Sequence, residues 1–382
     1  MEQKKRWMMF IIALAVIFSC IPMRAEAQGV SAQSAILMEQ SSGRILFEKD
    51  AFTKRRIASI TKIMTAIIAI ESGKMNDTVT VSSRAVRTEG SSVYLKEGEK
   101  IKLRDLVYGL MLRSGNDAAV AIAEHVGGSV EGFVFLMNQK ALEIGMKNTH
   151  FANPHGLDDS EDHYSTAYDM ALLMRYAMQN KEFRKISGTK TYRAPNPDEK
   201  WDRIWRNKNK LLTNLYEYCT GGKTGYTKKA KRTLVTTASK EGLNLIAVTL
   251  NAPDDWNDHI SMYEYGFDHY VVAKINSKKM GRKVDDRFYR YHIQATRDLR
   301  YPVTDKEMKK LRLHVQLIRP KKQWKKDQEL VPKIVGKATL YLNGEAVDEV
   351  PLLYKPSLRQ TSKDAAEPVW KQVFFLGVGG NG

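Results

Sequence analysis

A hydroxyl and an amine lie three residues apart in Ser59-Ile60-Thr61-Lys62, at the start of an apolar stretch expected to be helical. Residues i and i+3 share one helix face, with Cβ atoms about 5–6 Å apart, so the amine can reach the hydroxyl. The helix N-terminus adds partial positive charge where an oxyanion would form. The pair indicates a nucleophilic serine with a lysine base, although Ser-x-x-Lys alone arises by chance about once or twice in such a chain.

Two further motifs strengthen this interpretation. Ser114-Gly115-Asn116 lies between two helical patterns, in a loop that can direct both polar side chains into a cleft. Lys223-Thr224-Gly225 is expected to open a strand, where the glycine permits close backbone approach and the lysine supplies positive charge. Three motifs in this order favour a functional site over a surface pair of Ser and Lys.

These motifs resemble those of the active-site serine penicillin-recognising enzymes, which carry Ser-x-x-Lys, Ser-x-Asn and Lys-Thr-Gly. Within that class the chain is similar to the D-alanyl-D-alanine carboxypeptidases, and most similar to the sporulation-type enzyme of endospore-forming bacilli. The resemblance covers most of residues 28–272. The stretches that carry it are residues 56–62, 114–117, 155–157 and 165–167.

The resemblance implies a mechanism for these residues. Ser59 would attack the carbonyl between the two terminal D-alanines of a peptidoglycan stem peptide and form an acyl-enzyme, with Lys62 as base. Ser114 would relay protons toward the leaving amine, and Asn116 would orient Lys62 and the peptide. An unperturbed lysine is rarely neutral at pH 7, so burial and the charge of Lys223 must lower the pKa of Lys62. β-Lactams would be covalent inhibitors.

The resemblance also implies a substrate-binding strand. Lys223, Thr224 and the strand that continues through Gly225 would hold the substrate and its terminal carboxylate. Backbone N–H groups of Ser59 and Tyr226 would form the oxyanion hole. Lys208, in a basic stretch upstream, is a candidate carboxylate contact, and the alternative is a solvated run of charge.

Two other groups of residues lack a supporting pattern. A metal site would need the polar side chains His155, Asp158, Asp159, Asp162 and His163. No His-Glu-x-x-His or cysteine set accompanies them, which favours a polar loop. No histidine pattern accompanies Cys219 as a catalytic cysteine would need, so we interpret it as a small residue beside the sheet. We therefore expect an enzyme without metal or other cofactor.

Three alternative functions stay open. A β-lactamase on the same scaffold is disfavoured, because the middle motif is Ser-Gly-Asn and no Glu-x-x-Leu-Asn segment follows. A D,D-endopeptidase would cleave a similar D-Ala bond. A non-catalytic penicillin-sensing or wall-binding module is the alternative from another class, and three intact motifs argue against it.

The elements that must position these motifs run as strands, then helices, then strands. This order predicts the α+β type of α/β fold, an antiparallel sheet flanked by helices as in serine β-lactamases and transpeptidases. A hairpin is expected over 34–39 and 44–48, and a helix from Ile60 to Gly73. Further expected elements are helices over 103–112, 118–126, 133–144 and from 167, strands over 233–238 and 243–250, and a closing helix near 255–272.

A second, smaller all-β domain is expected after the catalytic domain of residues 28–273. Apolar residues alternate with polar ones from Leu311 to Leu317, and Asn343-Gly344 is a strong hairpin signal. This domain is predicted over 283–355. The amphipathic tail, 356–382, is either an interfacial helix that anchors the protein to a membrane or a strand that docks on the β domain.

The first 27 residues have the layout of a secretory signal peptide. Three basic residues, Lys4 to Arg6, precede an apolar run that is too short to span a bilayer, and Ala25-Glu26-Ala27 follows. A lipoprotein site at Cys20 is disfavoured because Phe18 sits where small residues are preferred. We expect export and a peripheral location in the cell envelope, on the outer face of the cytoplasmic membrane.

The chain is long enough for two to three domains, at 382 residues, and its net charge of +18 is unevenly distributed. Residues 28–273 hold 33 basic and 29 acidic residues, whereas residues 274–382 hold 24 and 12. For an exported protein this predicts anionic wall polymers or lipid headgroups as partners, and no nucleic acid. The expected docking surface surrounds Trp324 and consists of Arg319, Lys321, Lys322, Lys325 and Lys326.

Overall fold

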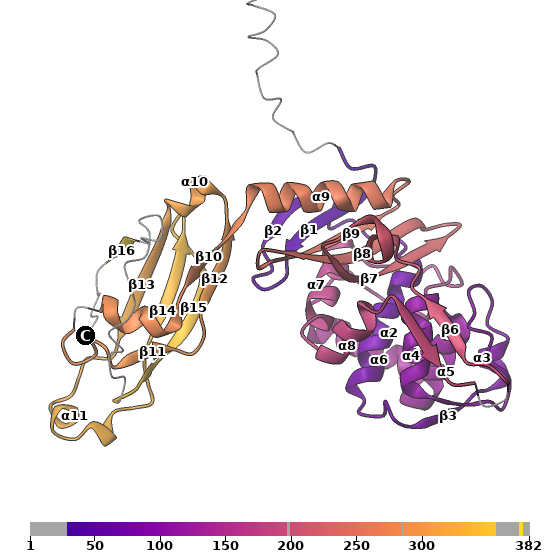
Figure 1. Ribbon diagram of the computed structural model, residues 1–382, viewed down its shortest axis with the longest axis horizontal. Coiled ribbons are helices and arrows are strands. Elements are labelled where there is room, and N and C mark those ends of the chain that lie inside the picture. Colours follow the sequence, from indigo (N-terminus) through magenta and orange to yellow (C-terminus); the bar gives the residue numbers. More distant parts are fainter. Residues whose placement is uncertain (1–28, 197–198, 285, 357–373, 377–382) are drawn as a thin grey trace, which may run out of the picture. The chain divides into compact units, whose positions relative to one another are not determined.

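The computed structural model describes residues 29–196, 199–284, 286–356 and 374–376 (Figure 1). From Ser31 onward the chain forms one compact unit. Its largest hydrophobic cluster draws on residues between Ile36 and Leu250, and a second cluster draws on residues from Ala273 to Tyr354. The predicted signal peptide lies outside the described residues.

The main sheet has five antiparallel strands in the order β2-β1-β9-β8-β7. The strands are β1 (Ser34–Glu39), β2 (Ile45–Lys49), β7 (Cys219–Thr227), β8 (Lys231–Lys240) and β9 (Leu243–Leu250). Helix α9 (Asp255–His269) packs on one face and α7 (Ala167–Ala177) on the other (Figure 1). The predicted fold class, an antiparallel sheet flanked by helices, is confirmed.

Helix α2 (Lys62–Glu71) is the centre of the helical cluster, and all but its last residue are buried. Its sequence is apolar almost all round, as expected of a helix enclosed by other elements. The surrounding helices are α4 (Leu103–Arg113), α5 (Asn116–Gly127), α6 (Val130–Glu143) and α8 (Lys181–Ser187), and α3 (Ser83–Val86) is a single turn. A 3₁₀ turn, η1 (Ala58–Thr61), precedes α2, so the expected start at Ile60 was not α-helical.

Two expected boundaries were wrong. Lys223 does not open its strand but lies inside β7, which starts four residues earlier at Cys219. The strand can include the two glycines before Lys223 because a β-bulge lies between Cys219 and Gly221. The closing helix ends at His269. Val271–Ile275 then forms β10, which pairs with β12 (Leu299–Val303), since β-branched residues favour a strand.

Three small elements had no counterpart in the prediction. They are the hairpin β3–β4 (Thr78–Thr80 and Lys100–Lys102), the hairpin β5–β6 (Thr191–Ala194 and Arg203–Arg206) and a π-helical turn, η2 (Leu211–Leu215). Helix α4 packs against both strands of β5–β6, so the second hairpin borders the helical cluster.

A second five-stranded sheet has the order β11-β15-β14-β13-β16. Its strands are β11 (Ile293–Ala295), β13 (Leu311–Leu317), β14 (Ile334–Leu342), β15 (Glu345–Tyr354) and β16 (Phe374–Leu376), with short helical turns η3 (Ser277–Lys283), α10 (Asp305–Met308), α11 (Lys322–Lys326) and η4 (Gln328–Leu330). Asn343 and Gly344 both have positive φ, as a tight β14–β15 turn requires.

The tail enters the structure only as β16, which pairs in parallel with β13, and residues 357–373 and 377–382 lie outside the described residues. Among the described residues no single helix is long and apolar enough to cross a bilayer. Helices α5 and α6 meet the length and composition requirement only as a pair, and they are bent by 84° where they join.

Candidate active site

Ser59 lies in a backbone turn that tolerates little change. Ala58, directly before it, has φ +50°, a left-handed conformation that costs energy for a residue other than glycine. A Cβ on Gly156 would lie 1.9 Å from the Ala58 carbonyl oxygen, so only glycine fits there. Thr61 Oγ1 donates to the same oxygen at 2.8 Å. The turn therefore holds a half-buried Ser59 hydroxyl in a defined position.

The Lys62 amine is completely buried and has three oxygen neighbours. Its Nζ lies 2.9 Å from Ser59 Oγ, 2.7 Å from Asn116 Oδ1 and 2.6 Å from the His155 carbonyl oxygen. Burial lowers the pKa of Lys62 well below its usual value, and the charges of Lys223 and Lys208 lower it further. The site therefore favours a neutral amine.

The bond pattern around Lys62 fits a neutral amine that acts as a base. The amide and carbonyl oxygens of Asn116 and His155 can only accept, so they take the two N–H groups of a neutral lysine. The remaining lone pair then faces Ser59 Oγ, which is the one neighbour able to donate a proton.

The middle motif is positioned at the junction of α4 and α5. Ser114 follows α4 with φ +66°, and Asn116 is the first residue of α5. Asn116 is held by its backbone N–H, which donates to Ser91 O at 2.7 Å, and by Nδ2, which donates to Glu89 O at 2.5 Å. Its amide oxygen therefore points at Lys62 with little freedom.

Lys223 is the second buried lysine of the site. Its Nζ donates to Ser114 Oγ at 3.1 Å and to the Thr224 carbonyl oxygen at 2.6 Å. Burial, with a smaller effect of the Lys208 charge, lowers the pKa of Lys223 to about 7. Lys223 therefore changes charge near neutral pH, and it contacts the hydroxyl of the middle motif.

Strand β7 lies directly against the Ser59 turn. A Cβ on Gly225 would lie 2.3 Å from Thr233 Oγ1 and 3.0 Å from the Ser59 backbone nitrogen, so the approach requires glycine. Thr233 Oγ1 in turn donates to the Ile57 carbonyl oxygen at 3.0 Å. Thr224 is half-buried, the Tyr226 side chain is exposed, and β7 is an edge strand.

Lys208 reaches the same site from the segment that follows β6. Its Nζ donates to Ser91 Oγ at 3.3 Å, next to the backbone carbonyl that holds Asn116. Burial lowers the pKa of Lys208, and so does the charge of Arg113. All three motifs and Lys208 thus converge on one place, with Lys208 at its outer side.

Sequence reasoning missed the supports of this site. The His155 carbonyl accepts from Lys62, and carbonyls have no residue-specific signature. Asp117 accepts from the backbone N–H groups of Val93 and Leu95 and so fixes the loop that carries Ser91. The small polar residues Gly90-Ser91-Ser92 were the only signal available for this loop.

The other candidate residues do not form a metal site or a second nucleophile, although the His155 carbonyl and the His163 ring contact residues of the first motif. Within the described ranges, no three His, Cys, Asp or Glu side chains come together in a way that could hold a metal ion. Burial lowers the pKa of His155 to about 3 and that of His163 to about 4, and His163 Nε2 contacts Thr61 Oγ1. Cys219 lies in β7 rather than beside the sheet, and burial raises its pKa to about 11.

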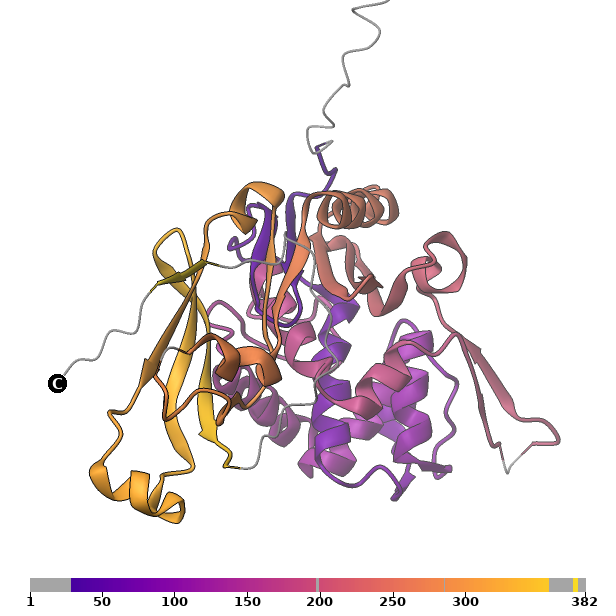
Figure 2. The ribbon, with the colours of Figure 1, turned by 60° about the vertical axis from the view of Figure 1, so that its left-hand side comes forward.

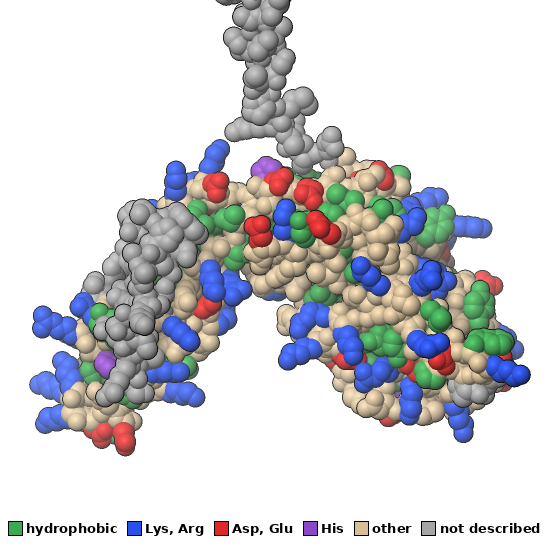
Figure 3. Space-filling view, viewed as in Figure 1, with side chains coloured by type: hydrophobic (Ala, Val, Ile, Leu, Met, Phe, Trp, Pro, Cys, Tyr) green, Lys and Arg blue, Asp and Glu red, His purple; other side chains and the backbone are tan. Residues whose placement is uncertain are grey.

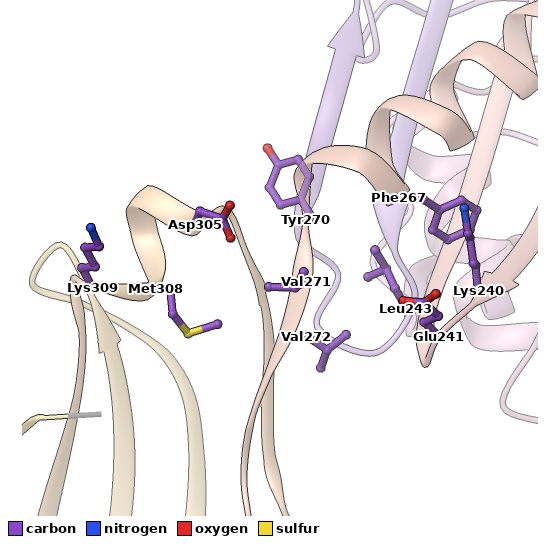
Figure 4. Close-up of a pocket in the computed structure, with 10 residues that line it drawn as sticks. All are labelled: Lys240, Glu241, Leu243, Phe267, Tyr270, Val271, Val272, Asp305, Met308 and Lys309. Carbon is purple, nitrogen blue, oxygen red and sulfur yellow. The ribbon is translucent and has the colours of Figure 1, made fainter. Parts of the chain in front are cut away.

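A cleft of about 740 Å³ lies elsewhere in the molecule (Figure 4). Its walls come from the β8–β9 turn, the end of α9, β10 and α10, and include Leu243, Phe267, Val272 and Met308. Phe267 and Lys240 lie side by side at one end of it. The cleft contains no residue of the three motifs.

A serine hydroxyl 2.9 Å from a buried lysine amine, with a second buried lysine on an adjoining edge strand, is the arrangement expected of a serine acyl-transfer enzyme of the penicillin-recognising type. The family model described as D-alanyl-D-alanine carboxypeptidase matches residues 21–254. The chain belongs to this family and is a serine-type peptidase.

Relatives and solved structures agree with this assignment. DacF of Bacillus subtilis, a D-alanyl-D-alanine carboxypeptidase, is 38% identical over 66% of this chain and 69% of its own length. DacC of Escherichia coli, also a D-alanyl-D-alanine carboxypeptidase, is 32% identical over 88% of this chain and 86% of its own length. Penicillin binding protein 5 of Haemophilus influenzae superposes with a TM-score of 0.68 at 27% identity, covering 86% of this chain and 97% of that one.

Proposed function

We propose that the protein removes the terminal D-alanine from peptidoglycan stem pentapeptides through an acyl-enzyme on Ser59. The observation that carries this proposal is the buried Lys62 amine, 2.9 Å from Ser59 Oγ, with its other two contacts made to acceptor oxygens. Lys62 takes the hydroxyl proton as Ser59 attacks the carbonyl between the two D-alanines. Water then hydrolyses the ester.

The leaving amine needs a proton, and Ser114 is placed to deliver it. Its hydroxyl contacts Lys223 Nζ, so a proton can pass between the two buried lysines through hydroxyl groups once substrate closes the site. Asn116 orients Lys62 through its amide oxygen. Backbone N–H groups of Ser59 and Tyr226 form the oxyanion hole, where one donor can be worth about 3 kcal/mol.

The terminal carboxylate of the substrate binds at the cationic end of the site. Lys223, Thr224 and Lys208 supply the contacts, and the substrate backbone runs along the edge strand β7 through Gly225. Lys208 is exposed, but its Nζ donates to Ser91 Oγ at 3.3 Å beside the segment that holds Asn116, which supports a binding role over a solvated charge.

The rest of the chain indicates where the enzyme acts. A catalytic domain of residues 28–273 is exported by the signal peptide, residues 1–27, and acts in the cell envelope, where loss of D-alanine limits cross-linking. The resemblance to sporulation-type enzymes extends the proposal to the spore cortex. A β domain, 283–355, and an amphipathic tail, 356–382, hold the enzyme at an anionic surface of lipid or wall polymer.

Exposed cations support that last assignment. The loop between β13 and β14, residues 318–333, contains six basic and two acidic residues. Its basic side chains are exposed, while Trp324 at its centre is buried under Lys321. Figure 3 shows Lys and Arg side chains gathered over the part of the molecule that carries α11.

Two substrates test the proposal. The mature protein is incubated with labelled penicillin and, separately, with a pentapeptide ending in D-Ala-D-Ala. We expect covalent label on Ser59 and release of free D-alanine. No label and no D-alanine would refute the enzyme, label without D-alanine would favour a penicillin-sensing module, and rapid penicillin turnover would favour a β-lactamase.

A further inference from the structure

The turn between β7 and β8 carries cations that the proposed catalytic chemistry does not use. Residues 228–232, which form the turn and the start of β8, include four basic residues. Two of the four are paired with acids: Lys229 Nζ with Glu161 Oε1 at 2.6 Å, and Arg232 Nη2 with Asp255 Oδ1 at 2.5 Å. Lys228 and Lys231 are exposed, and neither forms an ion pair with any residue that the structure describes. We call these two lysines the turn cations.

The backbone of this turn is held in place. Thr227 Oγ1 accepts from the Ala230 backbone N–H at 3.0 Å, which closes the turn on itself. The Lys229 backbone N–H donates to Asp158 Oδ2 at 3.1 Å, and its side chain reaches Glu161 of the same loop, so the turn is also fastened to residues 157–161. The backbone that carries the turn cations is therefore preorganised before any ligand arrives.

Lys231 occupies a position that favours glycine. Its φ is +58°, in the left-handed region, which glycine adopts readily and other residues adopt at a cost in energy. Tight turns commonly place glycine at such positions. Here a long cationic side chain bears that cost directly opposite Thr227, with which it pairs in register. Local strain of this kind is typical of functional sites.

The path of the substrate leads to the turn cations. This step rests on the proposed function, in which the terminal carboxylate binds beside Lys223 and Thr224 and the attacked carbonyl faces the Tyr226 N–H. From the carboxylate to that carbonyl the peptide advances toward the end of β7, and the earlier residues of the stem continue in the same direction. Strand β7 is at the edge of its sheet, so its free backbone groups can pair with an extended peptide.

The residue that precedes the two D-alanines comes within reach of the turn cations. Gly225 lies against the Ser59 turn, and Lys228 is three residues further along, about 10 Å away at the rise of an extended strand. The long side chains of a lysine and of a diamino acid can bridge what remains. The Tyr226 ring lies between these two points, is 63% exposed and can cover the aliphatic part of the stem. Figure 2 shows α9 on one side of the main sheet and the helical cluster on the other, and the peptide follows β7 on the side of the helices.

Acids on the facing loop are already engaged. Arg56 forms ion pairs with Glu161 and, at 3.9 Å, with Asp158. Asp159 accepts from Asn153 Nδ2 at 2.5 Å. These contacts direct the loop carboxylates to other partners, so the turn cations remain available to an anionic group on the substrate.

We propose that Lys228 and Lys231 bind a free carboxylate on the diamino acid that precedes the two D-alanines of the stem, and so make the enzyme selective for acidic stems. Diaminopimelate carries such a carboxylate at the end of its side chain, whereas lysine and amidated diaminopimelate do not. Complementary charge at the rim of a site favours the matching ligand and leaves a mismatched one without a partner. The turn cations select the stem and take no part in proton transfer or bond cleavage.

The test uses two pentapeptides ending in D-Ala-D-Ala that differ only at this carboxylate: one has diaminopimelate as its third residue, and the other has the side-chain amide of diaminopimelate. For the mature wild-type protein, kcat/KM for D-alanine release should be about fivefold higher with the acid, which is the scale of an exposed ion pair. Salt at about 0.5 M should reduce this ratio to less than twofold. Lys228→Gln should do the same at low salt. Lys147→Gln, an exposed lysine on the loop after α6, is the matched control and should keep the wild-type ratio.

The outcomes separate this inference from the proposed function. Failure of wild type to cleave either peptide would refute the carboxypeptidase itself. Cleavage of both peptides with equal kcat/KM, or a ratio that Lys228→Gln leaves unchanged, would refute the turn cations alone. If Lys228→Gln does not fold, Lys231→Gly removes the other cation and suits the positive φ. This variant should also lower the ratio, and an unchanged ratio would overturn the proposal.

Discussion

Lysines gather in two regions of this molecule, and the two groups differ in burial. Lys62 and Lys223 are buried in the catalytic region, where each faces hydroxyl and carbonyl oxygens and each has a lowered pKa. The lysines of the 318–333 loop are exposed. Under the proposed function, the buried amines take part in proton transfer and the exposed amines bind anions, because desolvation disfavours the ammonium where water is excluded.

The charge distribution along the chain follows this division. Residues 28–273 are nearly balanced, with 33 basic and 29 acidic residues, although they hold the whole active site. Residues 274–382 hold twice as many basic as acidic residues. We propose that the net charge reflects docking to an anionic surface, whereas catalysis depends on a few buried lysines that hardly change the total.

Removing the nucleophile should have the largest effect. Ser59→Ala should abolish penicillin labelling and lower kcat for D-alanine release by about 10⁴-fold or more, because no acyl-enzyme can form. Intact-mass spectrometry and a D-alanine assay measure the two quantities. Ser72→Ala, at the other end of α2, is the matched control, and its Oγ makes only local bonds, to the Ala69 carbonyl oxygen and from the Lys74 backbone N–H, among the described residues. Residual labelling of Ser59→Ala would contradict the assignment.

The same substitution in the two lysine groups tests the comparison directly. Lys62→Met should lower kcat/KM by about 10³-fold, which corresponds to roughly 4 kcal/mol of transition-state stabilisation. Lys325→Met, in the exposed loop, should leave kcat/KM within twofold. Steady-state kinetics on the pentapeptide distinguish the two. Similar losses in both variants would show that burial is not what separates the groups.

The pH dependence should report both buried lysines. Lys62 must be neutral to accept a proton, so kcat/KM falls as pH drops through its lowered pKa. Lys223 must be charged to hold the carboxylate, so kcat/KM also falls as pH rises through about 7. In Lys223→Arg the guanidinium stays protonated, and the alkaline limb should move up by more than one pH unit. An unmoved alkaline limb would remove Lys223 from this role.

The smallest effect on catalysis should come from the exposed cations. Replacing Lys321, Lys322, Lys325 and Lys326 with Gln should weaken binding to anionic vesicles at least tenfold, since each lysine near such a surface contributes about 1 kcal/mol. Pentapeptide cleavage should stay within twofold. Vesicle co-sedimentation at low and high salt measures the binding.

Deletion of residues 368–382 tests the tail in the same assay. It should release the protein from anionic vesicles and leave peptide cleavage intact. Neutral vesicles serve as the control for both variants. Unchanged binding after loop substitution and tail deletion would refute docking through this part of the chain.

Local spacing was enough to predict that the Ser59 hydroxyl and the Lys62 amine meet. The two atoms lie 2.9 Å apart although Ser59 is in a 3₁₀ turn, because residues i and i+3 share a face in either helix. The convergence of residues 114–116 and 223–225 on that face depends on long-range packing, and only the family resemblance indicated it. The carbonyl of His155 could not be predicted, since any residue type can supply one.

Prediction of the fold was limited in the same way, by contacts between residues far apart in the sequence. The periodicity of apolar residues predicted the sheet and its covering helices. It did not predict the start of β7, because two glycines that suggest a loop belong to the strand, next to a β-bulge. The β5–β6 hairpin was missed because five of its eight strand residues are charged or exposed. Its stability comes from the ion pair of Arg203 with the buried Glu99 and from Trp205 packed on α4. Such tertiary contacts leave little periodic signal in the sequence.

The rate of Ser59 acylation as a function of pH tests the central claim most directly. Wild type and Lys62→Arg are mixed with a penicillin, and the acyl-enzyme is followed by intact-mass spectrometry. With a buried neutral Lys62 as base, wild-type acylation should stop rising well below pH 10, and Lys62→Arg should be slower at least 10²-fold throughout. A wild-type rate that keeps rising to pH 10, or an arginine variant that acylates normally, would contradict a lysine base at this site.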